Sequence, residues 1–142
     1  MNKIRKLLVA LTIVLLGITL LGCNNEKSDK FLVVSTTTML NDAVKQLAGD
    51  NVEAVSLIKA GVDPHTYTLV SQDVKKLQKA DLVIVSGLHL EAQMGETLKT
   101  LGDKVLDIGV TLEEKHNNND GVVLLGWEDQ LHDPHFWFNV DY

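Results

Sequence analysis

The stretch "FLVVSTTTMLNDAVKQLAGD", residues 31–50, predicts a strand followed by a helix. Six of its first seven residues are apolar or β-branched, without clean alternation, which is typical of a strand covered on both faces of a parallel sheet. The period then becomes that of a helix with one apolar face, and Gly49 is placed to end that helix. The apolar face comprises Leu40, Ala43, Val44, Leu47 and Ala48. A strand leading into a helix is the repeating unit of an α/β domain.

The same alternation continues along the chain. Further strands are expected over 52–58, 81–87 and 104–109, and further helices over 71–80 and 88–101. Ser71 is a candidate cap of the second helix, and the third presents Leu90, Met94, Leu98 and Leu101 on one side. This order predicts an α/β fold with a mainly parallel four-stranded sheet flanked by helices. Ligands of such sheets bind on loops beyond the carboxyl ends of the strands.

The remaining segments give weaker signals. Residues 111–131, which include the polar tract "EEKHNNND", are expected to form a loop. The segment "HFWFNV", residues 135–140, could begin either a strand or a helix, and its aromatic side chains are expected to pack in the core.

The beginning of the chain predicts export. A short basic stretch is followed by an uncharged run from Leu7 to Gly22, shorter than the ~20 apolar residues of a typical membrane span. Residues 1–22 therefore resemble a secretory signal peptide. They end in "LLGC", the lipobox pattern of bacterial lipoproteins, so Cys23 is expected to be lipidated; a free or buried thiol is the alternative. Residues 23–30 would form a polar tether, and residues 31–142 one domain.

The charge of the chain argues against one class of partner. The formal net charge is −6, and removal of residues 1–22 would take away three of the 13 basic residues and none of the 19 acidic ones, leaving −9. An acidic protein is poorly suited to bind the phosphate backbone, so we expect no nucleic-acid partner.

The tripeptide "DPH" occurs twice, and it contains both prolines of the chain. Proline fixes its own backbone and restricts the preceding residue, so each tripeptide presents its histidine, His65 or His135, from a stiff turn. Neutral imidazole is a common metal ligand, and two histidines with carboxylates would suit Zn²⁺ or Mn²⁺. The aspartate of each tripeptide could cap the turn or hold the far nitrogen of an imidazole. The alternative is two loop histidines that face solvent.

The other three histidines are weaker candidates. His89 is expected to be a cap or a packing residue, and His116 a solvated loop residue. His132 could be an auxiliary ligand, but an exposed loop histidine is the preferred interpretation. A hydrolytic metalloenzyme, with His65 and His135 holding an activated water, is a further reading. The sequence contains no HExxH or G-x-S-x-G motif that would support an enzyme.

The stretches "VVSTTTML", "GVDPHTYTLVSQDVKKLQKADLVIVSGLHLE" and "DPHFWFNV", together with the lipobox, resemble the TroA-like solute-binding proteins of family 9. These are metal-binding receptor lipoproteins of bacterial zinc and manganese ABC importers. The resemblance covers nearly all of residues 23–142, in the right order. It implies that His65 and His135 are metal ligands. It also implies a receptor of two α/β lobes joined by a long helix, of which this chain would be the N-terminal lobe alone, without the C-terminal lobe that supplies the other two ligands.

The resemblance also implies a function and a location. The chain would be a receptor component, not an enzyme, that is anchored through Cys23 at the outer face of the plasma membrane, or periplasmic, and delivers metal to a membrane-embedded ABC permease. Alternatives are a surface adhesin and a non-functional receptor remnant. "GLHLE" and "DPHFWF" are similar to members that take manganese as well as zinc, whereas intrinsic affinity favours zinc. The choice between Zn²⁺ and Mn²⁺ stays open.

Overall fold

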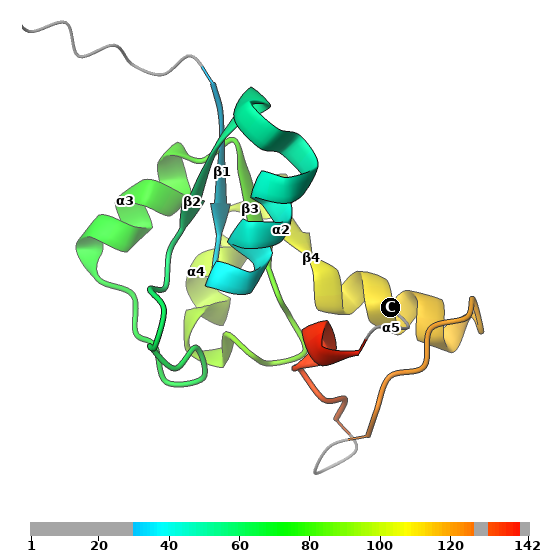
Figure 1. Ribbon diagram of the computed structural model, residues 1–142. Coiled ribbons are helices and arrows are strands. Elements are labelled where there is room, and N and C mark those ends of the chain that lie inside the picture. The colour runs from blue at the N-terminus through cyan, green and yellow to red at the C-terminus, as the bar shows by residue number, and fades with distance from the viewer. Residues whose placement is uncertain (1–29, 127–130, 140–142) are drawn as a thin grey trace, which may run out of the picture.

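A four-stranded parallel sheet forms the centre of the computed structural model, which describes residues 30–126 and 131–139 (Figure 1). The strands are β1 (Phe31–Ser35), β2 (Val52–Ser56), β3 (Leu82–Val85) and β4 (Val105–Asp107). They lie in the order β2-β1-β3-β4, and every neighbouring pair is parallel. The expected α/β fold class, with its mainly parallel four-stranded sheet, is confirmed.

Helices connect the strands and flank the sheet. The helices are α2 (Thr38–Ala48), α3 (Ser71–Lys79), α4 (Gly95–Lys99) and α5 (Ile108–Asn117). Short 3-10 helices occupy Gly49–Asn51, Ala92–Met94, Gly102–Lys104 and Phe136–Phe138. Helix α2 ends where the sequence predicts: Gly49 has φ +54°, and its N–H donates to the Lys45 carbonyl. Within the described ranges, no helix has the length and apolar character needed to cross a membrane.

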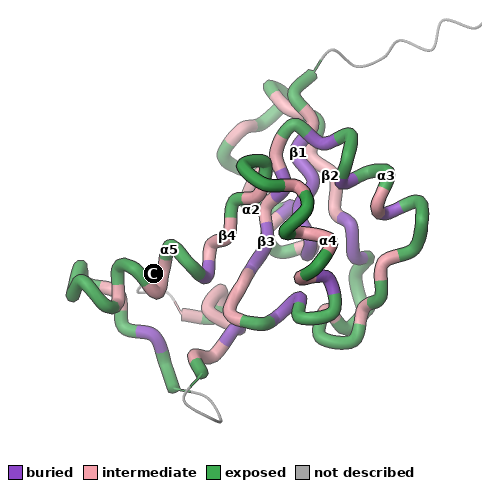
Figure 2. Tube along the Cα trace, turned by 180° about the vertical axis from the view of Figure 1, so that it is seen from behind, coloured by how far each residue is buried: buried purple, intermediate pink, exposed green. Residues whose placement is uncertain are grey.

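The main hydrophobic core lies on one face of the sheet. Val34 of β1 and Val83 of β3 project into it and are almost fully buried, as are Leu77 of α3 and Met94 beside α4. In Figure 2 buried residues lie along β1 and β3, whereas much of α5 is exposed. Helices α3 and α4 therefore share this face, which is the arrangement expected when parallel strands are joined by right-handed crossovers.

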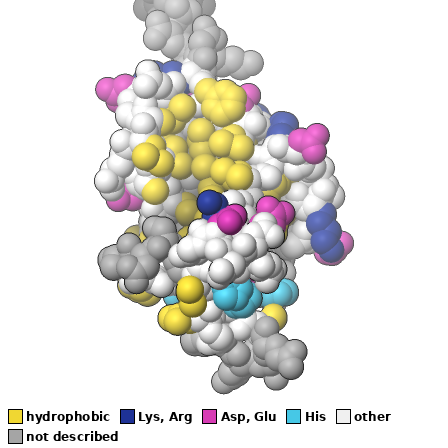
Figure 3. Space-filling view, turned by 90° about the vertical axis from the view of Figure 1, so that its right-hand side faces the viewer, with side chains coloured by type: hydrophobic (Ala, Val, Ile, Leu, Met, Phe, Trp, Pro, Cys, Tyr) yellow, Lys and Arg dark blue, Asp and Glu magenta, His cyan; other side chains and the backbone are white. Residues whose placement is uncertain are grey.

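The opposite face is covered unevenly. Helix α2 packs against β1 and β2. The β-register places Leu106 on this face beside Ile84, and the Leu106 side chain is 42% exposed. Leu47 of α2 was expected on the apolar face of its helix but is 89% exposed, so that prediction is wrong. Figure 3 shows apolar side chains gathered on one side of the molecule, above the histidines. A parallel sheet normally has both faces covered, so this half-open face is unusual for the fold class.

Helix α5 corrects the expectation of a loop over residues 111–131. The Asp107 side chain accepts a hydrogen bond from the Val110 N–H at 3.0 Å and so caps the first turn. The polar tract was expected to be a loop, but its Glu and Lys residues have high helix propensity. They continue the helix once the cap fixes its start. Only the part of that range beyond Asn117 is non-helical in the described residues.

The helix expected over residues 88–101 is also shorter than its pattern indicates. Gly87, Leu88 and His89 adopt left-handed conformations with φ of 75°, 50° and 66°. The buried Glu91 carboxylate holds this turn by accepting hydrogen bonds from the N–H groups of Ser86 and Gly87. A left-handed run cannot continue into an α-helix, so regular α-helix begins only at Gly95.

Helix α3 begins at Ser71, but Ser71 is not its cap. Val70 occupies the N-cap position, and the Asp73 side chain accepts the Val70 N–H at 3.1 Å. A carboxylate in the first turn satisfies the same kind of unpaired N–H group that a serine cap would, and it also favours the positive end of the helix dipole.

Candidate metal centre

The first "DPH" turn lies in the loop between β2 and α3. The Asp63 carboxylate accepts a hydrogen bond from the His65 N–H at 2.9 Å and one from the Thr66 hydroxyl at 3.2 Å. Of the two roles open to this aspartate, the structure shows turn capping. The cap and Pro64 together fix the backbone that carries His65, whose side chain is exposed.

The second "DPH" turn precedes the 3-10 helix Phe136–Phe138. The Asp133 carboxylate accepts the His135 N–H at 2.9 Å, and the same oxygen lies 2.7 Å from the His135 Nδ1. Asp133 therefore caps its turn and also holds the imidazole. A carboxylate at Nδ1 fixes the proton on that nitrogen, so the lone pair of His135 lies on Nε2.

The charge of Asp133 is stabilised by this geometry. Hydrogen bonding from the His135 N–H holds the pKa of the Asp133 carboxyl below its usual value, partial burial opposes the shift, and the hydrogen bond and charge of the His135 ring add to it. The ionised carboxylate is therefore the dominant form at neutral pH, and it acts as a hydrogen-bond acceptor for the ring.

The two turns converge although they are 70 residues apart in sequence. The His65 Nε2 and the His135 Nε2 are 3.5 Å apart, and the ring centroids are 5.5 Å apart with planes tilted by 59°. Trp137 lies edge-on against His135, with ring centroids 5.4 Å apart. The arrangement brings two imidazole nitrogens to one point at the rim of the domain, where both could contact the same ion.

Two histidines are all that the described chain assembles at this point. Within residues 30–126 and 131–139, no group of three or more His, Cys, Asp and Glu side chains is placed to hold a metal ion. The neighbouring hollow, of about 350 Å³, is lined by Asp133, His135 and Phe138 among others.

Phe138 is 80% exposed, so the expectation that it packs in the core is wrong.

The other three histidines do not join His65 and His135 at the candidate metal site. His89 is exposed in the left-handed turn and lines a separate open hollow of about 660 Å³. His116 is part of α5, where its Nδ1 lies 3.2 Å from the Val122 carbonyl oxygen, so it is not a solvated loop residue. His132 contacts His116 edge-on, and its buried Nδ1 reaches no hydrogen-bond partner among the described residues.

Sequence patterns missed one contact beside the site. The Tyr67 hydroxyl donates to the buried Asp73 carboxylate at 2.8 Å. The available signal was a tyrosine two residues after His65 and an aspartate in the first turn of the next helix. Cys23, the expected lipid anchor, lies outside the described residues, as do residues 1–22 and most of the tether.

Comparison with known families identifies the class of protein. The sequence model of the family ZnuA, "zinc-uptake complex component A periplasmic", matches residues 33–142. The match covers well over half of the chain, so the chain belongs to this family of metal-binding solute-binding proteins.

Individual relatives agree with this assignment. The manganese-binding lipoprotein MntA of Bacillus subtilis is 34% identical over 126 residues, which are 85% of this chain and 40% of MntA. The manganese ABC transporter substrate-binding lipoprotein PsaA of Streptococcus pneumoniae is 35% identical over 152 residues, covering 99% of this chain and 47% of PsaA. The solved structure of the periplasmic zinc-binding protein TroA from Treponema pallidum matches with a TM-score of 0.65 at 40% identity, over 78% of this chain and 38% of TroA.

The chain spans less than half the length of these relatives. All three are named for the metal that they bind or carry, and none is named as an enzyme. The two metals in those names, manganese and zinc, are the two that the sequence leaves open.

Proposed function

We propose that this chain is the metal-binding lobe, residues 31–142, of a receptor that delivers Zn²⁺ or Mn²⁺ to a membrane-embedded ABC permease. The metal is cargo, and His65 and His135 are its ligands. The observation that carries the proposal is the 3.5 Å separation of their Nε2 atoms, with the Asp133 carboxylate orienting one ring.

The separation suits a shared ion. Two nitrogens that each lie ~2.0–2.1 Å from a tetrahedral Zn²⁺ are roughly 3.3–3.4 Å apart. The observed distance is within a few tenths of an ångström of that value, so a metal ion could enter with little movement of either ring. The carboxylate at Nδ1 of His135 is the kind of outer contact that metal-ligating histidines usually make.

Two protein ligands supply only half of a four-ligand shell. Water, or groups from the rest of the receptor, must complete it. Complete structural zinc sites supply ~10–16 kcal/mol, so a half shell should bind more weakly by several orders of magnitude. Weak binding by this chain alone is therefore part of the proposal.

Isothermal titration of Zn²⁺ and of Mn²⁺ into residues 24–142 tests the site. His65→Ala and His135→Ala should each weaken binding at least tenfold. The control is His89→Ala, which removes an exposed imidazole that lines a different hollow. Equal affinity in both site variants and the unaltered chain would refute the assignment.

We also propose that residues 1–22 are a signal peptide and that Cys23 carries the lipid which holds the receptor at the outer face of the plasma membrane, with residues 23–30 as tether. The lipobox sequence "LLGC" supports this, as does the word lipoprotein in the names of MntA and PsaA. Labelling cells with radioactive palmitate should mark the unaltered protein and leave Cys23→Ala unmarked. Label in the variant would contradict the anchor.

A further inference from the structure

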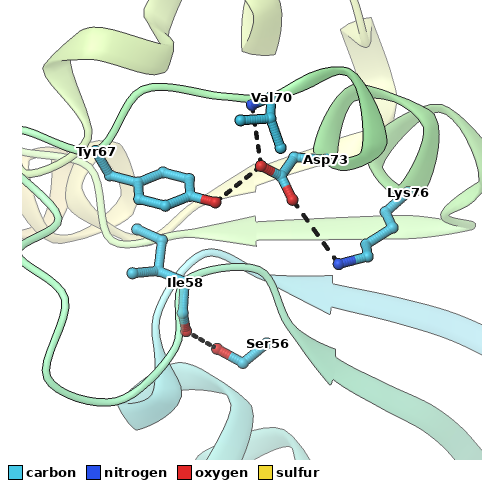
Figure 4. Close-up of polar contacts among 6 residues, drawn as sticks. All are labelled: Ser56, Ile58, Tyr67, Val70, Asp73 and Lys76. Atoms are coloured by element: carbon cyan, nitrogen blue, oxygen red, sulfur yellow. Dashed lines mark hydrogen bonds and ion pairs between the residues drawn. The ribbon is translucent and has the colours of Figure 1, made fainter.

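A hydrogen bond ties the loop that carries His65 to helix α3. The Tyr67 hydroxyl donates to the Asp73 Oδ2 at 2.8 Å (Figure 4). Tyr67 stands only two residues beyond His65, and Asp73 lies in the first turn of α3. Because only Thr66 separates Tyr67 from His65, this bond restricts the backbone that carries His65.

The Asp73 side chain is buried and held by several contacts. It is only 4% exposed, and the Oδ2 that accepts the Tyr67 hydroxyl also accepts the Val70 N–H at 3.1 Å. Its Oδ1 lies 3.8 Å from the Lys76 Nζ. A buried carboxylate is tolerated only where hydrogen bonds satisfy it, so Asp73 is held in one position and favours a donor at the place that Tyr67 occupies.

The ring of Tyr67 adds a second attachment. It is half-buried and packs against the main hydrophobic core, as does Leu69 two residues later. Tyr67 thus anchors the loop through apolar contact and through its hydroxyl, a pairing that is common for buried tyrosines.

The other end of the loop is also held. Beyond the end of β2, the N–H of Leu57 donates to the Ser35 carbonyl at 2.8 Å, and that of Ile58 to the Thr36 carbonyl at 2.9 Å. The Ser56 hydroxyl donates to the Ile58 carbonyl at 2.7 Å, as Figure 4 shows. The exposed segment that presents His65 is therefore fixed on both sides.

We propose that the Tyr67–Asp73 hydrogen bond positions His65, holding its imidazole at the place where it meets His135 before metal arrives. This inference rests on the proposed function, because it concerns the affinity of that same site. A ligand that is already ordered loses less conformational freedom on binding, so the anchor raises metal affinity without touching the metal. Tyr67 is a positioning residue, not a ligand.

The variant Tyr67→Phe tests this, because it keeps the ring and removes only the hydroxyl. Amide hydrogen exchange over residues 61–69 should become faster, and Zn²⁺ affinity measured by titration should fall about three- to tenfold, the equivalent of one net hydrogen bond. Circular dichroism checks that the domain still folds. The control is Thr100→Val, which removes a hydroxyl that donates to the Thr97 carbonyl at the end of α4, and it should change neither quantity.

The outcomes separate the two proposals. Unchanged exchange in Tyr67→Phe would show that the hydroxyl does not hold the loop, and faster exchange with unchanged affinity would show that holding the loop does not position His65; either overturns the inference. A folded, unaltered chain that binds neither Zn²⁺ nor Mn²⁺ would instead overturn the proposed function, and the positioning role with it.

Discussion

At the scale of single residues, the two aspartates of the "DPH" tripeptides do different work. Both cap their turns through the N–H of the following histidine. Only Asp133 also contacts the ring, so His135 is oriented by its own turn. His65 depends on the loop around it, including Tyr67. The same tripeptide therefore presents two histidines that are held in place by different contacts.

Replacing Asp133 by alanine should weaken Zn²⁺ binding about 10- to 100-fold, the usual effect of losing the outer partner of a metal-ligating histidine. The reason is that His135 loses both the cap of its turn and the group that fixes its lone pair on Nε2. Titration of the purified variant measures this. Asp120→Ala, which removes an exposed carboxylate in the loop after α5, is the control, and equal losses in both variants would contradict the role of Asp133.

At the scale of elements, the turn after β3 and the start of α5 depend on one another. The Asp107 side chain that caps α5 lies directly against Gly87, the first residue of the left-handed turn. A side chain at position 87 would occupy the space of that carboxylate. The turn and the helix cap therefore require glycine here for two reasons, the space and a φ of +75°.

Gly87→Ala should destabilise the domain more than Gly102→Ala. Both positions have a positive φ, and alanine at either should lose about 1–2 kcal/mol of stability for the left-handed backbone. Only Gly87→Ala also displaces the helix cap, which should cost about 1 kcal/mol more. A built Cβ at Gly102 meets no atom within 4 Å, which makes it the matched control. Urea unfolding of both variants gives the comparison, and equal losses would refute the coupling.

At the scale of the whole molecule, the stability of the described domain is concentrated on one side of the sheet. Helices α3 and α4 close the main core, whereas the other face is only partly covered by α2. The contribution of an apolar helical residue to stability therefore depends on the face of the sheet against which its helix packs, and the helical period alone does not reveal it. Leu77 and Leu47, both helical leucines, are the extreme cases, at 0% and 89% exposed.

Leu77→Ala should lower the free energy of unfolding by about 2–5 kcal/mol, the range for leucines truncated in a packed core. Leu47→Ala should change it by no more than about 0.5 kcal/mol, as exposed substitutions usually do. Both changes leave a strong helix former in a helix, so the difference reports burial alone. Urea denaturation monitored by circular dichroism measures both values, and similar losses would mean that the α2 face is as well packed as the core.

The sequence by itself determined the alternation of strands and helices as far as β4, the parallel α/β class and the two stiff turns that present His65 and His135. These follow from local signals: apolar runs, helical periodicity and prolines that restrict their own neighbours. Only the tertiary structure decided that the two imidazoles lie 3.5 Å apart, that Tyr67 reaches Asp73 and that Leu47 is exposed. Helix α5 escaped prediction because its polar tract resembles a loop, although its cap, Asp107, immediately precedes it. The left-handed turn at Gly87 escaped because an apolar helical period continues through it, and its close approach to Asp107 joins residues 20 positions apart. The physical reason is that contacts between residues tens of positions apart depend on strand order, register and packing, which no short stretch of sequence records.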